Sequence, residues 1–344
     1  MDESAWSGAD SVLDATGNNR HASPVNGASP DDATPLARGG NPGTCGYGTF
    51  NGTDQEVEDS DAGSYLNGLN AVTASAWVFN TDSLAGNNRG IFFTDNAPVG
   101  KDHRLGLRYD TAGFNGGGDD VIKAGVQTTD CNDSSDCVQV ETQSDQMQLN
   151  TWQHVAMTWE SGGELRIYVN GQDVTDPGSE EGWGTGGSID AVGGLFIGQG
   201  AKSDLWQGRI DEFRIYDQAL TPAQVQSVFQ DTHPCPLTDD DVQAGRVTLN
   251  DTNGNPAFKS VCFDNEFPQT PLVFALTDEQ DNQPAALRVR NVTTSGFDIA
   301  QVEPDGADGP SGSTVVDFVA MVPGTYTVEG GTQIIADSIS TTNS

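Results

Sequence analysis

Short runs in which apolar and polar residues alternate follow one another from the start of the chain to about residue 231. Such alternation is typical of half-buried β-strands, whereas a helix repeats its apolar positions every three or four residues. Clusters of Gly, Asn and Asp separate the runs and predict turns. We expect strands at residues 72–80, 89–95, 104–110, 121–128, 152–160, 164–171, 194–200 and 208–217. Many short strands at this spacing predict a β-sandwich or barrel.

The stretch TPAQVQSVF, which begins at Thr221, is the helix signal in this otherwise β-type pattern. Thr221 suits an N-cap and Pro222 suits the first helical position. Residues 232–238 combine prolines with the start of an acidic run and predict a linker. We therefore expect a first domain over 1–231 and a second over 239–344, where further strand-like runs predict a smaller β-sandwich.

The charge of the chain limits its partners. Its 15 Lys and Arg against 50 Asp and Glu give a formal net charge of -35. Such a surface repels nucleic acid and anionic lipid, so neither is expected as a partner. Two explanations of the charge remain open: adaptation to a salty environment, and calcium sites among the carboxylates. No apolar run approaches the roughly 18 residues of a membrane span, and the acidic first ten residues do not predict a signal peptide.

Four stretches resemble the laminin-G-like, concanavalin-A-like jelly-roll family, and they occur in the order of that family. They are VLDATGNNRHA (12–22), VTASAWVFNTDSL (72–84), WQHVAMTWESGGELRIYVNGQDV (152–174) and GRIDEFRIYDQALTPAQV (208–225). The resemblance implies that the first domain is a jelly roll. It also implies a structural calcium site between the first and the last strand.

The second domain is similar to the H-type-lectin-like sandwiches in SVCFDNEFPQTPLVFAL (260–276) and LRVRNVTTSGFDI (287–299). The order of the two domains resembles the N-terminal part of accessory proteins of the mannose-sensitive haemagglutinin pilus. This resemblance implies a surface adhesin with pilus components among its partners, and a further region after the last residue.

The five cysteines predict an oxidising compartment. Cys131 and Cys137 flank a short polar loop, so we expect them to form a disulfide. Jelly rolls bring their terminal strands side by side, and Cys45 with Cys235 is the second expected pair. Cys262 remains as a buried free thiol or as a competitor for Cys235. Both pairings predict an extracellular or periplasmic protein.

The stretch GRIDEFRIY contains the residue that we single out for metal binding. With a period of two residues, Asp211 shares the core-facing side of the strand with Phe213 and Ile215. A carboxylate on that side must be neutralised, because a buried unpaired charge is costly.

Calcium would neutralise Asp211, and the resemblance implies Asp14 and the backbone near Asn18 as further ligands. Calcium takes six to eight oxygen ligands, so these residues form only part of a shell. Alternatively, Asp211 accepts backbone N–H groups, or it pairs with Arg209 or Arg20.

Loops on a rigid sandwich commonly carry binding residues. The loop-rich region over 103–120 and the exposed-loop tryptophan in EEGWGTGG supply our candidates, since an exposed Trp can stack on a sugar. The candidate ligand-binding residues are His103, Arg104, Tyr109, Asp119, Asp120 and Trp183. Solvated turns, and a Trp183 folded over the edge of the sandwich, are the alternative interpretation.

We do not expect an enzyme. Glycoside hydrolysis needs two carboxylates at a defined separation, and related jelly-roll hydrolases place them on one strand as Glu-x-Asp-type runs. We identify no such run in an expected strand, and no hydrolase elbow, zinc-type Cys and His spacing or phosphate loop. The hypothesis is therefore a non-enzymatic extracellular adhesin that recognises a glycan or a surface protein. A structural spacer within a larger surface or pilus-associated protein is the alternative.

Overall fold

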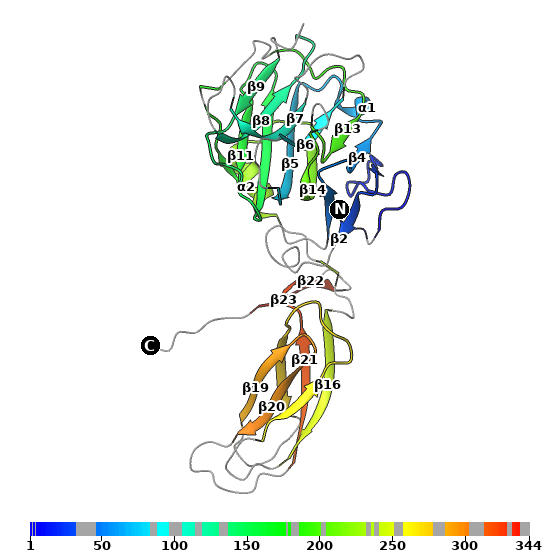
Figure 1. Cartoon of the computed structure of the whole chain (residues 1–344), viewed down its shortest axis with the longest axis vertical. Coiled ribbons are helices and arrows are strands. Elements are labelled where there is room, and N and C mark those ends of the chain that lie inside the picture. Colours follow the sequence, from blue (N-terminus) through cyan, green and yellow to red (C-terminus); the bar gives the residue numbers. More distant parts are fainter. Residues whose placement is uncertain are drawn as a thin grey trace. The chain divides into compact units, whose positions relative to one another are not determined.

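A computed structural model gives the structure of the chain (Figure 1). The described residues are 1, 3, 5–31, 46–82, 88–95, 105–113, 119–130, 137–176, 178–179, 186–200, 204–231, 235–236, 241–250, 257–277, 286–302, 313–328 and 332–337. The chain forms two compact units. The described residues up to 231 belong to unit 1, and those from 235 onward belong to unit 2.

Unit 1 is a sandwich of two seven-stranded sheets. The first sheet has the order β1 (Ser23–Val25), β4 (Glu56–Asp59), β13 (Leu195–Ile197), β6 (Arg89–Thr94), β7 (Gly106–Ala112), β8 (Asp119–Val126) and β9 (Val138–Glu141). The second has the order β12 (Gln172–Asp173), β11 (Arg166–Val169), β10 (Trp152–Glu160), β5 (Ala71–Asn80), β14 (Gln207–Tyr216), β3 (Tyr47–Asn51) and β2 (Ser29–Asp31). All strand pairs in both sheets are antiparallel, as expected for a jelly roll.

The core of unit 1 lies between the two sheets and follows the alternation of the sequence. On β10, Val155, Met157 and Trp159 face inward and are buried. The same core cluster includes Leu107 of β7 and Ile122 of β8 from the first sheet. The eight strands that the alternation predicts are all present, although their ends shift by a few residues.

The helices of unit 1 are α1 (Gly63–Leu66) and α2 (Pro222–Gln230). Thr221 caps α2 as expected: its hydroxyl accepts the backbone N–H of Gln224, and the Gln224 side chain accepts the backbone N–H of Thr221. This capping box satisfies two N–H groups that a helix start would otherwise leave unpaired.

Helix α2 covers part of the outer face of the second sheet. Phe229 of α2 lies 5.5 Å from the ring of Trp77 and 5.9 Å from the ring of His154, measured between centroids. Burial, with a smaller contribution from the positive charge of Arg214, lowers the pKa of His154 to about 3. His154 is therefore a neutral ring within an aromatic contact.

Unit 2 contains a smaller sandwich of two three-stranded sheets (Figure 1). One sheet has the order β16 (Val242–Leu249), β21 (Thr314–Met321) and β18 (Leu272–Thr277). The other has the order β17 (Lys259–Cys262), β20 (Gly296–Val302) and β19 (Ala286–Thr293). The core between them centres on four phenylalanines, Phe263, Phe267, Phe297 and Phe318.

A third sheet of unit 2 joins β15 (Cys235–Pro236), β22 (Gly324–Val328) and β23 (Thr332–Ala336). Among the described residues, no helix has the length and apolar composition that crossing a membrane requires. The architecture confirms the predicted fold class, an all-β jelly-roll sandwich followed by a smaller β-sandwich. The predicted linker at 232–238 lies largely outside the described residues, and the exact domain bounds stay a prediction.

Candidate functional site at one rim of the jelly roll

Polar side chains gather at one end of unit 1, where β5 ends and β6 begins and where β8 begins beside β7. Strand pairing sets this arrangement, because Arg89 of β6 lies opposite Tyr109 of β7. Tyr109 belongs to the buried core, so this part of the rim lies at the edge of the space between the sheets. We call Asn80, Asp82, Arg89, Tyr109 and Asp120 the rim cluster.

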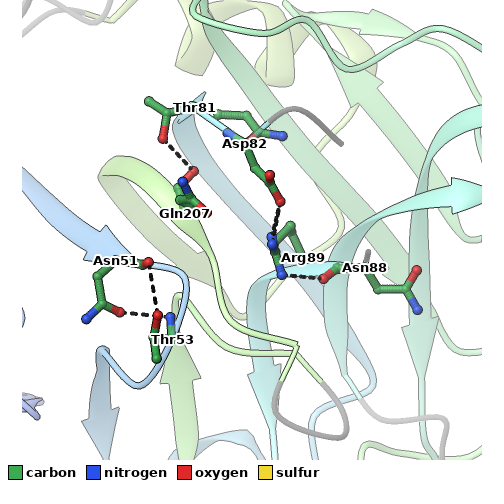
Figure 2. A network of polar contacts seen from close by, with 8 residues as sticks. Asn51, Thr53, Thr81, Asp82, Asn88, Arg89 and Gln207 are labelled. Carbon is green, nitrogen blue, oxygen red and sulfur yellow. Dashed lines mark hydrogen bonds and ion pairs between the residues drawn. The ribbon is translucent and has the colours of Figure 1, made fainter. Parts of the chain in front are cut away.

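Asp82 and Arg89 form an ion pair at this rim (Figure 2). The Nε of Arg89 donates to Oδ2 of Asp82 over 2.8 Å, and Nη2 contacts the same oxygen. The Nη1 of Arg89 also donates to the backbone oxygen of Asn88. Each side chain of the ion pair is 13% exposed, so most of each is shielded from solvent. The pair thus holds the Asp82 carboxylate in one orientation.

Tyr109 and Asp120 form a second fixed contact in the rim cluster. The Tyr109 hydroxyl donates to Oδ1 of Asp120. Burial raises the pKa of Tyr109, and the hydrogen bond to Asp120 and the negative charges of Asp120, Asp110 and Asp82 raise it further. The phenol therefore stays protonated and acts as a hydrogen-bond donor to Asp120. Arg89, which holds Asp82, lies opposite Tyr109 in the pairing of β6 with β7, so both carboxylates belong to the same part of the rim.

Each of these two carboxylates is anchored through one oxygen and leaves the other available. Arg89 engages Oδ2 of Asp82, and Tyr109 engages Oδ1 of Asp120. Among the described residues, Oδ1 of Asp82 and Oδ2 of Asp120 have no hydrogen-bonding partner in the protein. A ligand would meet two oriented acceptor oxygens, which suit hydroxyl or amide donors.

Asn80 lies behind the rim and is fully buried. Its side-chain oxygen accepts the backbone N–H of Asp82 over 2.9 Å, which fixes the turn that follows β5. The amide nitrogen of Asn80 is buried and has no hydrogen-bonding partner among the residues that the structure describes. An unsatisfied buried amide costs roughly 1–3 kcal/mol, so such a group calls for a structural or functional explanation.

The backbone of β14 lies close to the backbone of β5 at the same rim. Thr81 donates its backbone N–H and its hydroxyl to the carbonyl oxygen of Gln207 at the start of β14 (Figure 2). Gly208 follows with a φ of 138°, and a Cβ atom at this position would lie 2.0 Å from the carbonyl oxygen of Phe79. Only glycine permits this approach. On β3, Asn51 contacts Thr53 through its side chain and its backbone, which completes the network drawn in Figure 2.

A buried ion pair lies on the outward side of β7 and β8, behind the rim. The Nζ of Lys123 lies 2.7 Å from Oδ2 of Asp110 and donates to the backbone oxygen of Ala112 over 2.6 Å. Arg108 approaches the same carboxylate to 3.7 Å. Lys123 and Asp110 are both buried. The pair fixes neighbouring segments of β7 and β8, from which Tyr109 and Asp120 extend.

The structure brings together two of the six predicted ligand-binding residues, Tyr109 and Asp120. The others fall outside the description: His103, Arg104 and Trp183 as whole residues, and Asp119 in its side chain. Sequence analysis missed Asn80, Asp82 and Arg89. The signal was present in the polar residues that follow the apolar run VTASAWVF, since side chains at a strand end lie on the rim of a sandwich.

Asp14 has a different environment from the one that the calcium prediction gave it. Its carboxylate accepts the backbone N–H groups of Thr16 and Arg20 and the hydroxyl of Thr16. Burial alone would raise the pKa of Asp14, but the hydrogen bonds from Thr16 and Arg20 outweigh it and hold that pKa below its ordinary value. Asn18 is exposed and donates to the Thr16 hydroxyl.

The hydrogen bonds of Asp14 fit a turn-capping carboxylate better than a metal ligand. The part of the chain that the structure describes holds no group of three His, Cys, Asp or Glu side chains suited to a metal ion. Calcium binding by Asp14, Asn18 and Asp211 therefore stays a prediction.

The prediction that Asp211 shares a face with Phe213 and Ile215 is wrong. A β-bulge lies between Asp211 and Arg214, and Glu212 within it has a φ of 48°. Ile210 faces the core before the bulge, and Phe213 and Ile215 pack against the core after it. An extra residue in the bulge shifts the alternation by one position.

Asp211 is consequently directed to the other face of the sheet, opposite Trp77 of β5. It is fully buried there, and the amino nitrogen of Met1 lies 4.0 Å from its Oδ1.

One strand that sequence analysis did not expect carries two acids in the i, i+2 spacing that was sought for a hydrolase. β4 has the sequence EVED, in which Val57 is buried in the core and Glu56 and Glu58 lie on the opposite face. Burial raises the pKa of Glu56, and the negative charge of Glu58 raises it further. Sequence analysis missed β4 because four residues with three acids do not resemble a strand.

The cysteines are described in part. Cys137 is disulfide-bonded, whereas Cys45 and Cys131, and the side chain of Cys235, lie outside the described residues. Both predicted pairings therefore stay predictions. Cys262 is a free thiol at the end of β17, and it is exposed rather than buried.

Comparisons with solved structures give several distant similarities. Domain 4 of a GH43 extracellular arabinanase from Geobacillus stearothermophilus, solved with arabinotriose, matches at 20% identity and a TM-score of 0.43, covering 64% of this chain and 93% of that one. The SAP-like pentraxin of Limulus polyphemus matches at 20% identity and a TM-score of 0.34, covering 48% and 71%. The receptor-binding domain of botulinum neurotoxin C/D mosaic serotype matches at 10% identity and a TM-score of 0.47, covering 87% and 78%. No curated protein matches the sequence.

A family match covers the jelly-roll strands from β4 to β14, which include those of the rim. The concanavalin A-like lectin/glucanases superfamily, in its Laminin_G_3 family, matches residues 50–226. These residues are more than half of the 344 in the chain, and they include the whole rim cluster and the first part of α2. The chain therefore belongs to the concanavalin A-like lectin/glucanases superfamily.

Proposed function

We propose that this protein is a non-enzymatic adhesin of the cell surface, and that it recognises a glycan through the rim cluster of unit 1. The observation that carries the proposal is the pair of anchored carboxylates. Asp82 and Asp120 each have one oxygen held by the protein and one oxygen available. Sugars present many hydroxyl donors, and sites for them combine a few oriented polar groups on a rigid frame.

The rim is preorganised from several sides. Arg89 orients Asp82, Tyr109 orients Asp120, and Asn80 fixes the turn between β5 and Asp82. Because these side chains are already ordered, binding costs little additional conformational entropy. A surface protein that presents hydroxyl or amide donors would meet the same acceptor oxygens. Such a protein is the second class of partner that the site would accept.

The experiment is a glycan-array screen of the full chain, followed by titration of any ligand against Asp82→Asn and Asp120→Asn. Each substitution replaces an acceptor oxygen with an amide and should weaken binding at least tenfold, since a good charged hydrogen bond contributes about 1.5–3 kcal/mol. Asp173→Asn is the matched control, because Asp173 pairs with Arg166 on a different strand of unit 1. Equal binding by the rim variants and the wild type would contradict the rim site. Failure of the full chain to bind any glycan or surface protein would favour the spacer.

We also infer an extracellular location for the protein. Cys137 forms a disulfide, and such bonds persist mainly in oxidising compartments.

The proposal also treats unit 2 as an H-type-lectin-like domain and includes an association of the protein with pilus components. Co-purification of the protein with assembled pili would support that association, and recovery only in a pilus-free fraction would contradict it.

Calcium is a separate part of the proposal. The complete burial of Asp211 supports a neutralising partner, whereas the hydrogen bonds that Asp14 already accepts compete with a metal. Thermal unfolding in EDTA and in millimolar calcium tests it at constant ionic strength. Calcium at about 100 times its Kd should stabilise the fold by about 2.7 kcal/mol, and Asp211→Asn should abolish the shift. An unchanged wild-type midpoint would contradict the metal site.

A further inference from the structure

Unit 2 exposes large apolar side chains on the outer face of its β16–β21–β18 sheet. Phe274 is 54% exposed, Leu276 is 76% exposed and Val319 is 41% exposed. Soluble monomers rarely expose contiguous apolar patches, and such patches commonly mark interaction sites.

The strand register makes this patch continuous. Phe274 of β18 lies directly opposite Val319 of β21, and Val319 lies opposite Ala244 of β16. Leu276 is two residues along β18 from Phe274, so it points to the same side. The intervening residue Ala275 packs against the core of unit 2. The exposed side chains therefore belong to the outer face and are not displaced core residues.

The remaining side chains of this outer face are nearly neutral as a group. Arg246 of β16 and Asp317 of β21 lie opposite each other and form a double hydrogen-bonded ion pair of 2.6 and 2.9 Å. Both are well exposed, at 62% and 49% of their side chains. The described residues that alternate onto this face are Ala244, Arg246, Thr248, Phe274, Leu276, Val315, Asp317 and Val319. They contain one positive and one negative charge.

We propose that this outer face binds the same face of a second copy of the chain, related by a two-fold axis. A two-fold contact requires a self-complementary surface. Here an apolar strip of Phe274, Leu276 and Val319 can pack against its counterpart. The adjacent Arg246 and Asp317 provide both charges, so each can face the opposite charge of the other copy. In a chain of net charge -35, a locally neutral apolar face is a surface that an equally acidic copy can approach.

The ionic strength decides how stable this dimer is. The net charge of -35 on each copy opposes association at long range. Raising the salt from about 0.1 M to about 1 M shortens the Debye length from about 10 Å to about 3 Å and removes most of that repulsion. The apolar contact itself is not weakened by salt. We therefore expect a dimer that strengthens with salt, opposite to one held by surface ion pairs.

Sedimentation equilibrium of the full chain at these two salt concentrations tests the proposal. Dimers should form at about 1 M NaCl and dissociate at about 0.1 M NaCl. Leu276→Asp and Phe274→Asp should each weaken the dimer at least tenfold at the higher salt. Leu13→Asp is the matched control, because Leu13 is 56% exposed in unit 1 and should leave dimerisation unchanged. The thermal midpoint of each variant verifies folding, which exposed positions should preserve.

A charge exchange distinguishes this face from other apolar contacts. Arg246→Asp alone should weaken the dimer, because two carboxylates then lie together on each copy. Arg246→Asp combined with Asp317→Arg should restore it, because the pair is re-formed in reverse. A monomer at both salt concentrations would overturn the proposal. A dimer that tolerates both Leu276→Asp and Phe274→Asp, or that the charge exchange fails to rescue, would also overturn it.

Discussion

Units 1 and 2 are both β-sandwiches, but they differ in the charged groups that their sheets bury and in the apolar side chains that their sheets expose. Unit 1 has two seven-stranded sheets and buries charged and polar side chains such as Lys123, Asp211 and His154. The sheets of the unit 2 sandwich have three strands each, and this unit leaves Phe274 and Leu276 exposed. Wide sheets covered on an outer face can shield polar groups and pair them. Narrow sheets have little cover, so an apolar outer face stays available for a partner.

The largest expected effect tests the buried charge of unit 1. Lys123→Met leaves the buried Asp110 without its ammonium partner and with the more distant Arg108 at 3.7 Å, so it should cost up to about 3–5 kcal/mol of unfolding free energy. Every tryptophan of the chain precedes residue 207, so tryptophan fluorescence during denaturation reports on unit 1. Lys259→Met is the matched control in unit 2, since the exposed Lys259 donates, among the described residues, to the backbone oxygen of Thr248. Hydrogen exchange of the unit 2 amides measures its effect, because unit 2 has no tryptophan. Similar small losses of unfolding free energy in both variants would contradict the claim that unit 1 depends on a buried ion pair.

The second test concerns the neutral histidine beneath α2. The unfolded chain protonates His154 near pH 6.5, whereas the folded chain does so only near pH 3. Stability from the neutral ring is therefore complete above pH 6.5 and is lost as the pH falls toward 3. At pH 4 this loss amounts to about 3 kcal/mol. His154→Phe should flatten the pH dependence of unit 1 stability by about this amount, measured by denaturant titration from pH 7 to pH 4. Parallel pH profiles for variant and wild type would contradict it.

A smaller effect should follow from weakening the cover over the second sheet. Thr221→Ala removes the capping hydroxyl of α2 and should cost about 1 kcal/mol. Hydrogen exchange of the α2 amides and the thermal midpoint of unit 1 measure it. Ser227→Ala in the same helix is the control and should be nearly neutral, because that hydroxyl only donates back to Ala223. If Thr221→Ala and Ser227→Ala have equal effects, the capping box does not stabilise the helix that covers the second sheet.

The smallest expected effect is a stabilisation. Glu56 has a raised pKa because of burial and the neighbouring Glu58. Its ionised form destabilises unit 1 at neutral pH, so Glu56→Gln should stabilise the fold there by a few tenths of a kcal/mol. The gain should disappear as the pH falls and Glu56 itself becomes protonated. Thermal unfolding at pH 7 and pH 4 measures the difference, and a gain at pH 4 equal to that at pH 7 would contradict this explanation.

The parts of the fold that were predictable are those with strong local patterns. WQHVAMTWE alternates over nine residues and forms β10, and Thr221 with Pro222 marks the start of α2. The acidic EVED gives no such signal, because β4 is stabilised by its neighbours β1 and β13 rather than by its own residue preferences. Tertiary pairing therefore determines the strands that sequence analysis missed.

The site was predictable only to the level of its loops. Tyr109 and Asp120 were selected from a polar stretch, but their contact depends on the pairing of β7 with β8. Asp82 and Arg89 are seven residues apart and meet because β5 ends and β6 begins at the same rim. In unit 2, the run PLVFALT does not alternate, so it cannot show which of its apolar residues face outward.

The bulge in β14 should make the closing strand tolerant of the loss of one residue. Its two ends are in register with β5 on either side of one extra residue, so the strand contains one residue more than its partner requires. Removing Glu212 would give a regular strand in which Ile210, Phe213 and Ile215 still face the core. The same deletion in the regular strand β10 would turn every later core residue to the opposite face. Within this family, gaps of a single residue should therefore be acceptable at this point of the closing strand and costly in the centre of the sheet.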